Sequence, residues 1–196
     1  MIDYFALLDQ PRAPWLDPAE LKERFHQKTL AAHPDTQKGG GANDNADAIF
    51  ASLNEAYQVL RDPKRRLHHF LSLEGAAPSS GGKTVPKQLE DLFPEVGLLS
   101  QHAQILSEKL KTASNALSIS LLKPQIFKLQ SEAKGTREKL QALADEASCE
   151  LQALSEAGSA SAGENLKRVT NLYYIFAYLT RWTAQLDEIQ FQLSQH

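Results

Sequence analysis

Few residues of this chain have the type and spacing for chemistry. The candidates are one cysteine, Cys149, six histidines, and the tripeptide His33-Pro34-Asp35. A histidine two residues from a carboxylate could form a general-base pair, but no nucleophile motif accompanies it. The histidines lack the i, i+4 spacing with a carboxylate that zinc-binding helices use, and one cysteine cannot build a Cys-based metal site or an internal disulfide. The residues therefore indicate neither a catalytic site nor a metal site.

Composition narrows the class of protein. The chain has 196 residues, is 42% hydrophobic and 23% charged, and carries a net charge of −3, which is typical of a globular protein. The charge gives no basic field for nucleic acid. The N-terminal residues do not resemble a signal peptide, and the longest apolar stretch, about Tyr173–Leu179, is too short to cross a bilayer. We expect a cytoplasmic protein that binds neither nucleic acid nor a membrane.

The elements that must position the tripeptide are helices. Good helix formers dominate and strand patterns are weak, so the chain is expected to be all-α. Asp17-Pro18 marks a helix start, and that helix runs to about Ala32, directly before His33. A second helix is expected from about Asp44–Asp47 to Arg61, and a short basic helix over Lys64–Leu73. The first two pack as a hairpin, with these residues expected to face inward: Leu21, Phe25, Leu30, Ile49, Phe50, Leu53, Ala56, Tyr57 and Leu60.

A Gly-, Ser- and Pro-rich stretch divides the chain. We expect one domain over 1–75, a linker over 76–86 and a helical bundle over 87–196. The bundle should contain three helices, over about Pro86–Ser118, Leu121–Glu156 and Glu164–Gln195, with a kink near Pro94 and Gly97 in the first. In the third, apolar residues recur at bundle spacing: Leu172, Ile175, Leu179, Trp182, Leu186, Ile189 and Leu193.

The setting of the tripeptide resembles a known family. The features that carry the resemblance are Asp3-Tyr4-Phe5-x-x-Leu8, Phe25 with His33-Pro34-Asp35, the stretch Asn54–Pro63, and Arg65 with Arg66. Residues 3–73 resemble a J domain, the module that activates DnaK-type heat-shock chaperones. The end of this segment, with Phe70-Leu71-Ser72-Leu73-Glu74-Gly75, is similar to the HscB type, whose members serve iron–sulfur cluster assembly. An N-terminal J domain followed by a three-helix antiparallel bundle is also the HscB arrangement.

The resemblance implies a co-chaperone that is not itself an enzyme and needs no cofactor. It implies that the second helix and the tripeptide dock on a DnaK/HscA-type chaperone and stimulate its ATP hydrolysis. In that docking Asp35 pairs with an arginine of the partner, and His33 and Pro34 shape the loop. The expected chaperone-binding residues are His33, Pro34, Asp35, Lys22, Arg24 and Lys28. The three basic residues could instead form an ordinary solvated helix face.

The resemblance also implies that the bundle binds an IscU-type iron–sulfur scaffold. The HscB-type acidic and apolar motif is only loosely kept at the start of the bundle, where the candidate residues are Leu89, Leu92, Phe93 and Val96. These residues could equally all be bundle core, and any that are exposed would form an apolar patch for a partner. A rival hypothesis is that the bundle is a structural or oligomerising coiled coil, with the J domain serving a different client.

Overall fold

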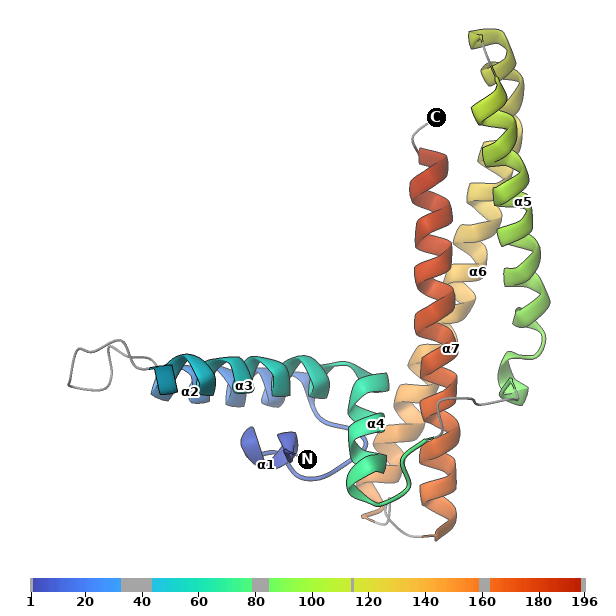
Figure 1. The fold of residues 1–196 in the computed structure, drawn as a ribbon. Helices are drawn as coiled ribbons and strands as arrows, with labels where there is room; N and C mark the ends of the chain where they lie inside the picture. The colour runs from blue at the N-terminus through green and yellow to red at the C-terminus, as the bar shows by residue number, and fades with distance from the viewer. Residues whose placement is uncertain (1, 33–43, 79–84, 114, 159–162, 195–196) are drawn as a thin grey trace. The chain divides into compact units, whose positions relative to one another are not determined.

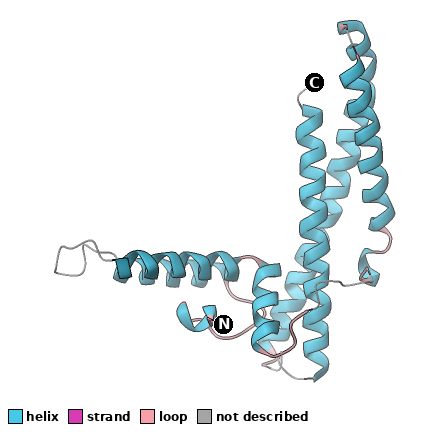
Figure 2. Cartoon of the chain, in the orientation of Figure 1, coloured by secondary structure: helices cyan, strands magenta, loops and turns pink. Residues whose placement is uncertain are grey.

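The described part of the chain is helical. The computed structural model describes residues 2–32, 44–78, 85–113, 115–158 and 163–194, and these ranges contain no strand. The N-terminal helices are α1 (Tyr4–Leu7), α2 (Pro18–Ala32), α3 (Asp44–Arg61) and α4 (Pro63–Leu73). After a 3-10 turn, η2 (Lys87–Leu89), come α5 (Leu92–Thr112), α6 (Ala116–Glu156) and α7 (Gly163–Ser194). Figure 1 shows the helices in chain order, and Figure 2 shows the helices and loops in separate colours. The all-α prediction is confirmed.

Contacts between residues divide the chain into two compact units. The first joins Met1–Gly81 to Ser148–Tyr173, and the second joins Gly82–Ala147 to Tyr174–His196. The end of α6 and the start of α7 therefore belong to the same unit as the N-terminal helices. The linker expected over 76–86 stays a prediction, because 79–84 lie outside the described ranges.

Two aspartates cap the starts of helices α2 and α4 in the first unit. The Oδ1 atom of Asp17 accepts hydrogen bonds from the backbone N–H groups of Ala19 (2.8 Å) and Glu20 (2.9 Å). Asp62 accepts from the N–H of Arg65 at 2.8 Å, and a proline follows each of these two aspartates. These side chains satisfy amides that have no partner within the first helical turn. The expected helix start at Asp17-Pro18 is confirmed.

The core of the first unit lies at one end of the hairpin. Helices α2 and α3 run side by side (Figure 1), and α1 and α4 also contact α3. The Phe25 ring stacks on the Tyr57 ring with centroids 4.4 Å apart. The other residues of this core are nearly inaccessible: Phe5, Leu8, Leu21, Leu53, Ala56, Leu60, Leu67, Phe70 and Leu71.

Three residues expected to face inward are exposed instead. Leu30 is 67% exposed, Phe50 47% and Ile49 41%. Among the side chains of α3 whose burial is described, residues 48–61, the first buried one is Leu53. Two helices side by side cannot surround a side chain without a third element, and among the described residues α1 and α4 supply that element only for the other part of the hairpin. The spacing of apolar residues therefore predicted the two helices correctly. It could not show how far along the hairpin α1 and α4 extend.

A buried arginine joins the two helices of the hairpin at their base. The Arg66 side chain is only 6% exposed. Its Nε donates to the carbonyl oxygen of Pro14 (2.9 Å), before α2, and its Nη1 donates to that of Leu60 (2.7 Å), near the end of α3. Burial lowers the pKa of this guanidinium to about 10, against the opposing effect of Asp62. Arg66 therefore stays charged at neutral pH and holds two carbonyl groups that would otherwise be buried without a donor.

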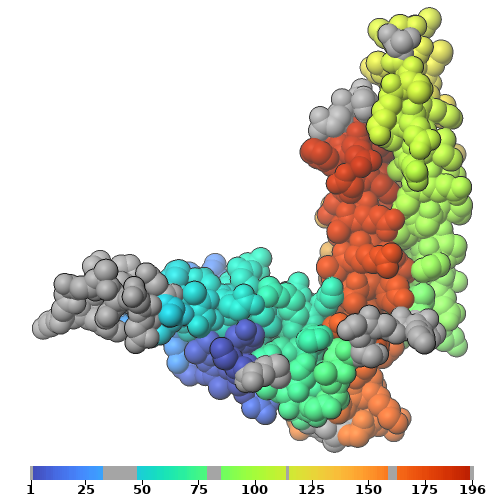
Figure 3. Space-filling model, viewed as in Figure 1, coloured from blue at the N-terminus to red at the C-terminus, as the bar shows by residue number. Residues whose placement is uncertain are grey.

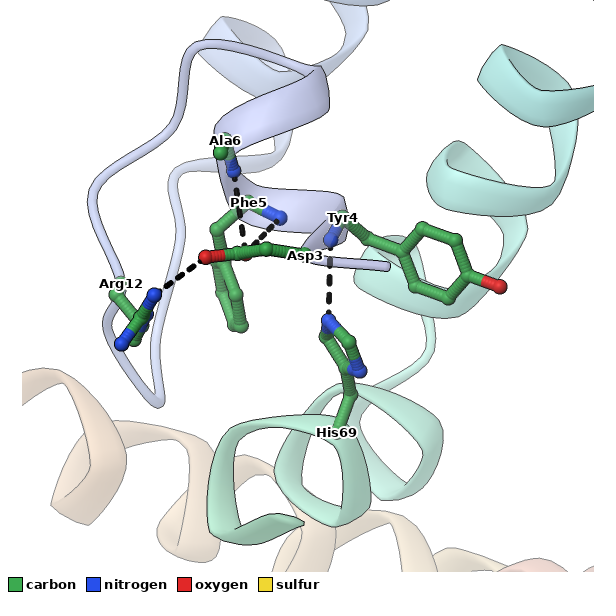
Figure 4. Close-up of polar contacts among 6 residues, drawn as sticks. All are labelled: Asp3, Tyr4, Phe5, Ala6, Arg12 and His69. Atoms are coloured by element: carbon green, nitrogen blue, oxygen red, sulfur yellow. Dashed lines mark hydrogen bonds and ion pairs between the residues drawn. The ribbon is translucent and has the colours of Figure 1, made fainter. Parts of the chain in front are cut away.

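Helix α1 is held against α4 through His69. The backbone N–H of Tyr4 donates to His69 Nε2 at 3.1 Å, and the ring of His69 lies 4.7 Å from that of Tyr4 and 5.6 Å from that of Phe5. Figure 4 shows this contact beside Asp3, whose carboxylate caps α1 and pairs with Arg12. Figure 3 shows the surface of α1 against that of α4. An imidazole that accepts at Nε2 is neutral, with its proton on Nδ1.

The surroundings lower the pKa values of both His69 and Asp3. Burial lowers the pKa of the His69 imidazole below its ordinary 6.5; the carboxylate of Asp3 opposes this shift, and His68 and Arg12 add to it. For Asp3, burial acts to raise the pKa, but the hydrogen bonds from Arg12, Ala6 and Phe5 outweigh it and the pKa is lowered. The junction is therefore built for a neutral histidine beside an ionised aspartate.

Residues 148–173 pack into the first unit through a few specific contacts. The backbone N–H of Trp15 donates to the Ser155 hydroxyl at 3.1 Å. The ring of His68 lies 5.9 Å from that of Tyr173, and Arg168 pairs with Glu150 at 2.7 Å. The segment just before α2 is thus attached both to α4, through Arg66, and to α6.

The second unit contains α5 with most of α6 and α7. All seven residues of the expected seam on α7 are buried inside the chain, each at most 5% exposed. The sequence predicted one helix from about Pro86 with a kink near Pro94 and Gly97. In the structure the helix is interrupted earlier, between the end of η2 at Leu89 and the start of α5 at Leu92. Pro94 then falls in the first turn of α5, where a missing N–H costs little.

Replacing Arg66 tests the junction at the base of the hairpin. Arg66→Met keeps the volume but leaves the Pro14 and Leu60 carbonyls without donors. We expect the free energy of unfolding to fall by about 2–3 kcal/mol, measured by urea denaturation followed by circular dichroism. The matched control is Arg65→Met, which removes an exposed ion pair with Glu55 and should cost no more than about 1 kcal/mol. Equal losses would contradict the role given to Arg66.

Acidification tests the α1–α4 junction. The pKa of His69 is lower in the folded than in the unfolded chain, so its contribution to stability is present above about pH 6.5 and is lost as the pH falls through the folded-state value. We expect the free energy of unfolding to fall between about pH 7.5 and pH 5, and to fall less in His69→Gln, which cannot titrate. Asp3 stays ionised over this range because its pKa is lowered below 3.8. The same pH dependence in both proteins would rule out His69 as the titrating group.

Candidate functional site

The tripeptide His33-Pro34-Asp35 directly follows the last residue of α2, Ala32, but itself lies outside the described residues. What the structure describes is its setting. Helix α2 ends before the tripeptide, and α3 begins at Asp44 and runs back alongside α2 (Figure 1). The hairpin therefore carries the tripeptide in the connection between two paired helices.

The three basic residues expected to bind a chaperone do not form one patch. Lys22 and Arg24 are exposed, and no described carboxylate pairs with either. Lys28 is partly buried and pairs with Asp9 at 2.7 Å. At about 100° per residue, Arg24 and Lys28 lie on one side of α2, and Lys22 lies about 160° away from Arg24 on the other.

The outermost face of α2 is polar rather than basic. Glu23 and Gln27 lie between the two basic sides and hydrogen-bond to each other at 2.9 Å. The inward face is fixed by Leu21, which is 2% exposed, and by Phe25 against Tyr57. A partner that contacts one side of α2 therefore meets Lys22. A partner that contacts the other side meets Arg24 and Lys28.

The four residues expected to bind a scaffold are divided by burial. Leu89 is 0% exposed, Leu92 8% and Val96 2%, so these three lie in the core of the second unit. Phe93 is 54% exposed, and its ring lies 6.2 Å from that of Trp182. Of the four, only Phe93 offers a large apolar surface to a partner.

Two further aromatic residues on α7 join Phe93. The rings of Tyr178 and Trp182 lie 5.4 Å apart, and Tyr178 is partly exposed. We call Phe93 and Tyr178, which both contact the ring of the buried Trp182, the aromatic surface. The sequence pattern predicts Trp182 on the bundle seam and indicates no site at Tyr178. Their spacing of four residues was the available signal, because residues i and i+4 share a helix face.

Polar contacts fix the first turns of α5 beside the aromatic surface. The carboxylate of Glu95 accepts from the Thr136 hydroxyl (2.6 Å) and from Lys139 Nζ (2.9 Å), both on α6. These contacts lower the pKa of Glu95, the Thr136 hydrogen bond most, against the effect of burial. Gln185 of α7 donates to the Ser100 hydroxyl of α5. Phe93 therefore projects from a helix that is attached to both of its neighbours.

The described residues contain neither a metal-ligand cluster nor a helix able to span a membrane. No three His, Cys, Asp or Glu side chains among them lie close enough to share a metal ion. None of their helices combines the length and the apolar character needed to cross a membrane.

Comparison with known proteins identifies the N-terminal segment and the fold. The family model of the DnaJ domain matches residues 3–69. The solved structure of chaperone HscB from Vibrio cholerae aligns over 98% of this chain and 99% of that one, with a TM-score of 0.54 and 19% sequence identity. The two chains therefore share a fold, with an N-terminal J domain and a C-terminal helical bundle.

Two curated relatives are co-chaperones of the HscB type, and the second matches most of the chain. Co-chaperone protein HscB of Proteus mirabilis is 38% identical over 76 residues, which span 38% of this chain and 44% of that protein. The match to this first relative thus covers less than half of its length. The co-chaperone protein HscB homolog of Paraburkholderia phymatum is 31% identical over 156 residues, which span 79% of this chain and 83% of that protein. This match covers more than two thirds of both chains at over 30% identity, and the chain belongs to the HscB family of J-domain co-chaperones.

Proposed function

We propose that this chain binds a DnaK/HscA-type chaperone through the α2–α3 hairpin and stimulates its ATP hydrolysis. The observation that carries the proposal is the His33-Pro34-Asp35 tripeptide, directly after α2 in a chain of the HscB family. The chain itself does not hydrolyse ATP in this proposal. We also propose a cytoplasmic location, as expected from the sequence.

Binding stimulates the chaperone only by favouring one of its states. A co-chaperone shifts its partner toward the hydrolysing state to the extent that it binds that state more tightly. Asp35 would pair with an arginine of the chaperone, and His33 and Pro34 would hold the loop in the shape that presents it. The exposed Lys22 and Arg24 would steer the encounter with an acidic surface, which affects the association rate more than the final affinity.

A substitution in the tripeptide tests this proposal. We expect His33→Gln to lower the stimulated ATPase rate at least about tenfold while the helical circular dichroism spectrum is unchanged, because few residues carry most of the energy of an interface. The control is His102→Gln, the same change at an exposed position of α5, which should leave stimulation intact. Full stimulation by a folded His33→Gln protein would exclude the J-domain mechanism.

We further propose that the aromatic surface binds an IscU-type iron–sulfur scaffold. Membership of the HscB family supports this client, and the 54% exposure of Phe93 beside Trp182 supports the location. Exposed aromatic residues that rest on a rigid support are typical centres of binding energy. The rival role as an oligomerising coiled coil is not favoured, because the residues of the expected seam are already buried within the chain.

Neighbouring residues of α5 allow a matched test of the scaffold proposal. We expect Phe93→Ala to weaken binding of an IscU-type scaffold about tenfold or more, with the free energy of unfolding changed by less than about 1 kcal/mol. Leu92→Ala should instead lower the free energy of unfolding by about 2–4 kcal/mol, since Leu92 is core. Calorimetric titration and urea denaturation measure the two quantities. Wild-type affinity in the Phe93→Ala protein would reject the aromatic surface as the binding site.

A further inference from the structure

A cavity lies beside the α1–α4 junction, away from the tripeptide in the sequence and not used in the proposals above. Its volume is about 240 Å³. Helices α1, α3, α4 and α7 contribute its lining, and all of the contributing residues belong to the first unit. The lining residues are Tyr4, Val59, Lys64, Arg65, His68, His69 and Tyr173.

The charged lining of the cavity is entirely cationic. Lys64 and Arg65 are cations, and no aspartate or glutamate lines the cavity. No described carboxylate lies within ion-pair distance of Lys64. Arg65 uses one nitrogen for Glu55 at 2.8 Å, which leaves other donors of its guanidinium available. The nearest carboxylate along the chain, Asp62, is occupied as the cap of α4.

His69 contributes a neutral ring to the lining. Its Nε2 already accepts the Tyr4 N–H, so the neutral ring carries its proton on Nδ1. Figure 4 shows the Tyr4 phenol extending past this ring, away from Arg12 and Asp3. The carboxylate of Asp3 therefore has its own partners on the other side of the junction.

The remaining lining is apolar or aromatic. Val59 is 7% exposed, and the rings of Tyr4 and Tyr173 pack against His69 and His68 at 4.7 and 5.9 Å. Such walls favour a ligand with a flat or apolar body, since burying apolar surface adds to any charge interaction. The volume suits one small molecule, being below the range of about 300–1,000 Å³ that is usual for drug-sized ligands.

We propose that this cavity binds a small organic oxyanion, a phosphate or carboxylate group on a compact apolar body, with Lys64 and Arg65 meeting the charge and Tyr4 and Tyr173 meeting the body. Such a ligand contacts α1, α4 and the start of α7 at once. Its binding therefore stabilises the first unit in proportion to its concentration over its Kd.

The test uses the full chain and three probes. Phenyl phosphate and benzoate carry the two possible anions on the same ring, and benzamide is the uncharged counterpart of benzoate. Binding is followed by ¹H–¹⁵N NMR at constant ionic strength, with chloride as the background anion. We expect saturable shifts at the backbone amides of Lys64, His68 and Tyr173 with at least one of the two anions, and none with benzamide. If phenyl phosphate binds more tightly, the site prefers a phosphate group; if benzoate binds more tightly, it prefers a carboxylate.

Matched variants separate a site from general attraction. Lys64→Gln should weaken binding of the preferred anion about tenfold, the loss expected for one charge-assisted hydrogen bond. Lys134→Gln makes the same charge change on an exposed face of α6 and should not alter the Kd. Circular dichroism checks that both variants are folded. Absence of saturable binding by either anion, equal binding of benzamide, or equal weakening by the two variants would each overturn the proposal.

Discussion

The base of the α2–α3 hairpin depends on the buried Arg66 guanidinium, which joins the segment before α2 to the end of α3. One cation donates to the carbonyl of Pro14, before α2, and to that of Leu60, near the end of α3. A buried charge without its acceptors would cost more than the hydrogen bonds contribute, so the three groups stay together or the junction opens. The helices that carry the tripeptide depend on this contact at their far end.

Other hydrogen bonds that connect the elements of the first unit lie at the same end of the hairpin. His69 accepts the amide of Tyr4, and Ser155 of α6 accepts that of Trp15. These contacts use directional hydrogen bonds where the apolar core is small. By contrast, Leu30 and Phe50 are exposed among the described residues at the other end of the hairpin, toward the tripeptide. Stability is thus concentrated away from the loop that is proposed to meet the chaperone, and a partner can contact the loop without disturbing the core.

The two proposed binding surfaces use different physics. The hairpin offers exposed charge on two sides of α2, which acts at a distance and orients an encounter. The aromatic surface offers Phe93 on a helix that Glu95 ties to α6, so its contact area is preorganised. One surface lies in each compact unit. A co-chaperone that joins a chaperone to its client needs such a separation, because both partners must be bound at the same time.

The amino-acid sequence by itself determined the helices and the family. Capping by Asp17 and Asp62 and the period of the α7 seam depend on residues within a few positions of each other, so local rules were sufficient. Exposure could not be read in the same way. From the sequence, four residues were equally good candidates for scaffold binding: Leu89, Leu92, Phe93 and Val96. Arg66 was notable only as a basic residue at a position where the J domain usually has one. Only tertiary packing left Phe93 outside, buried Arg66 between two carbonyls and brought Lys64 near Tyr173, because burial depends on which distant element covers a face.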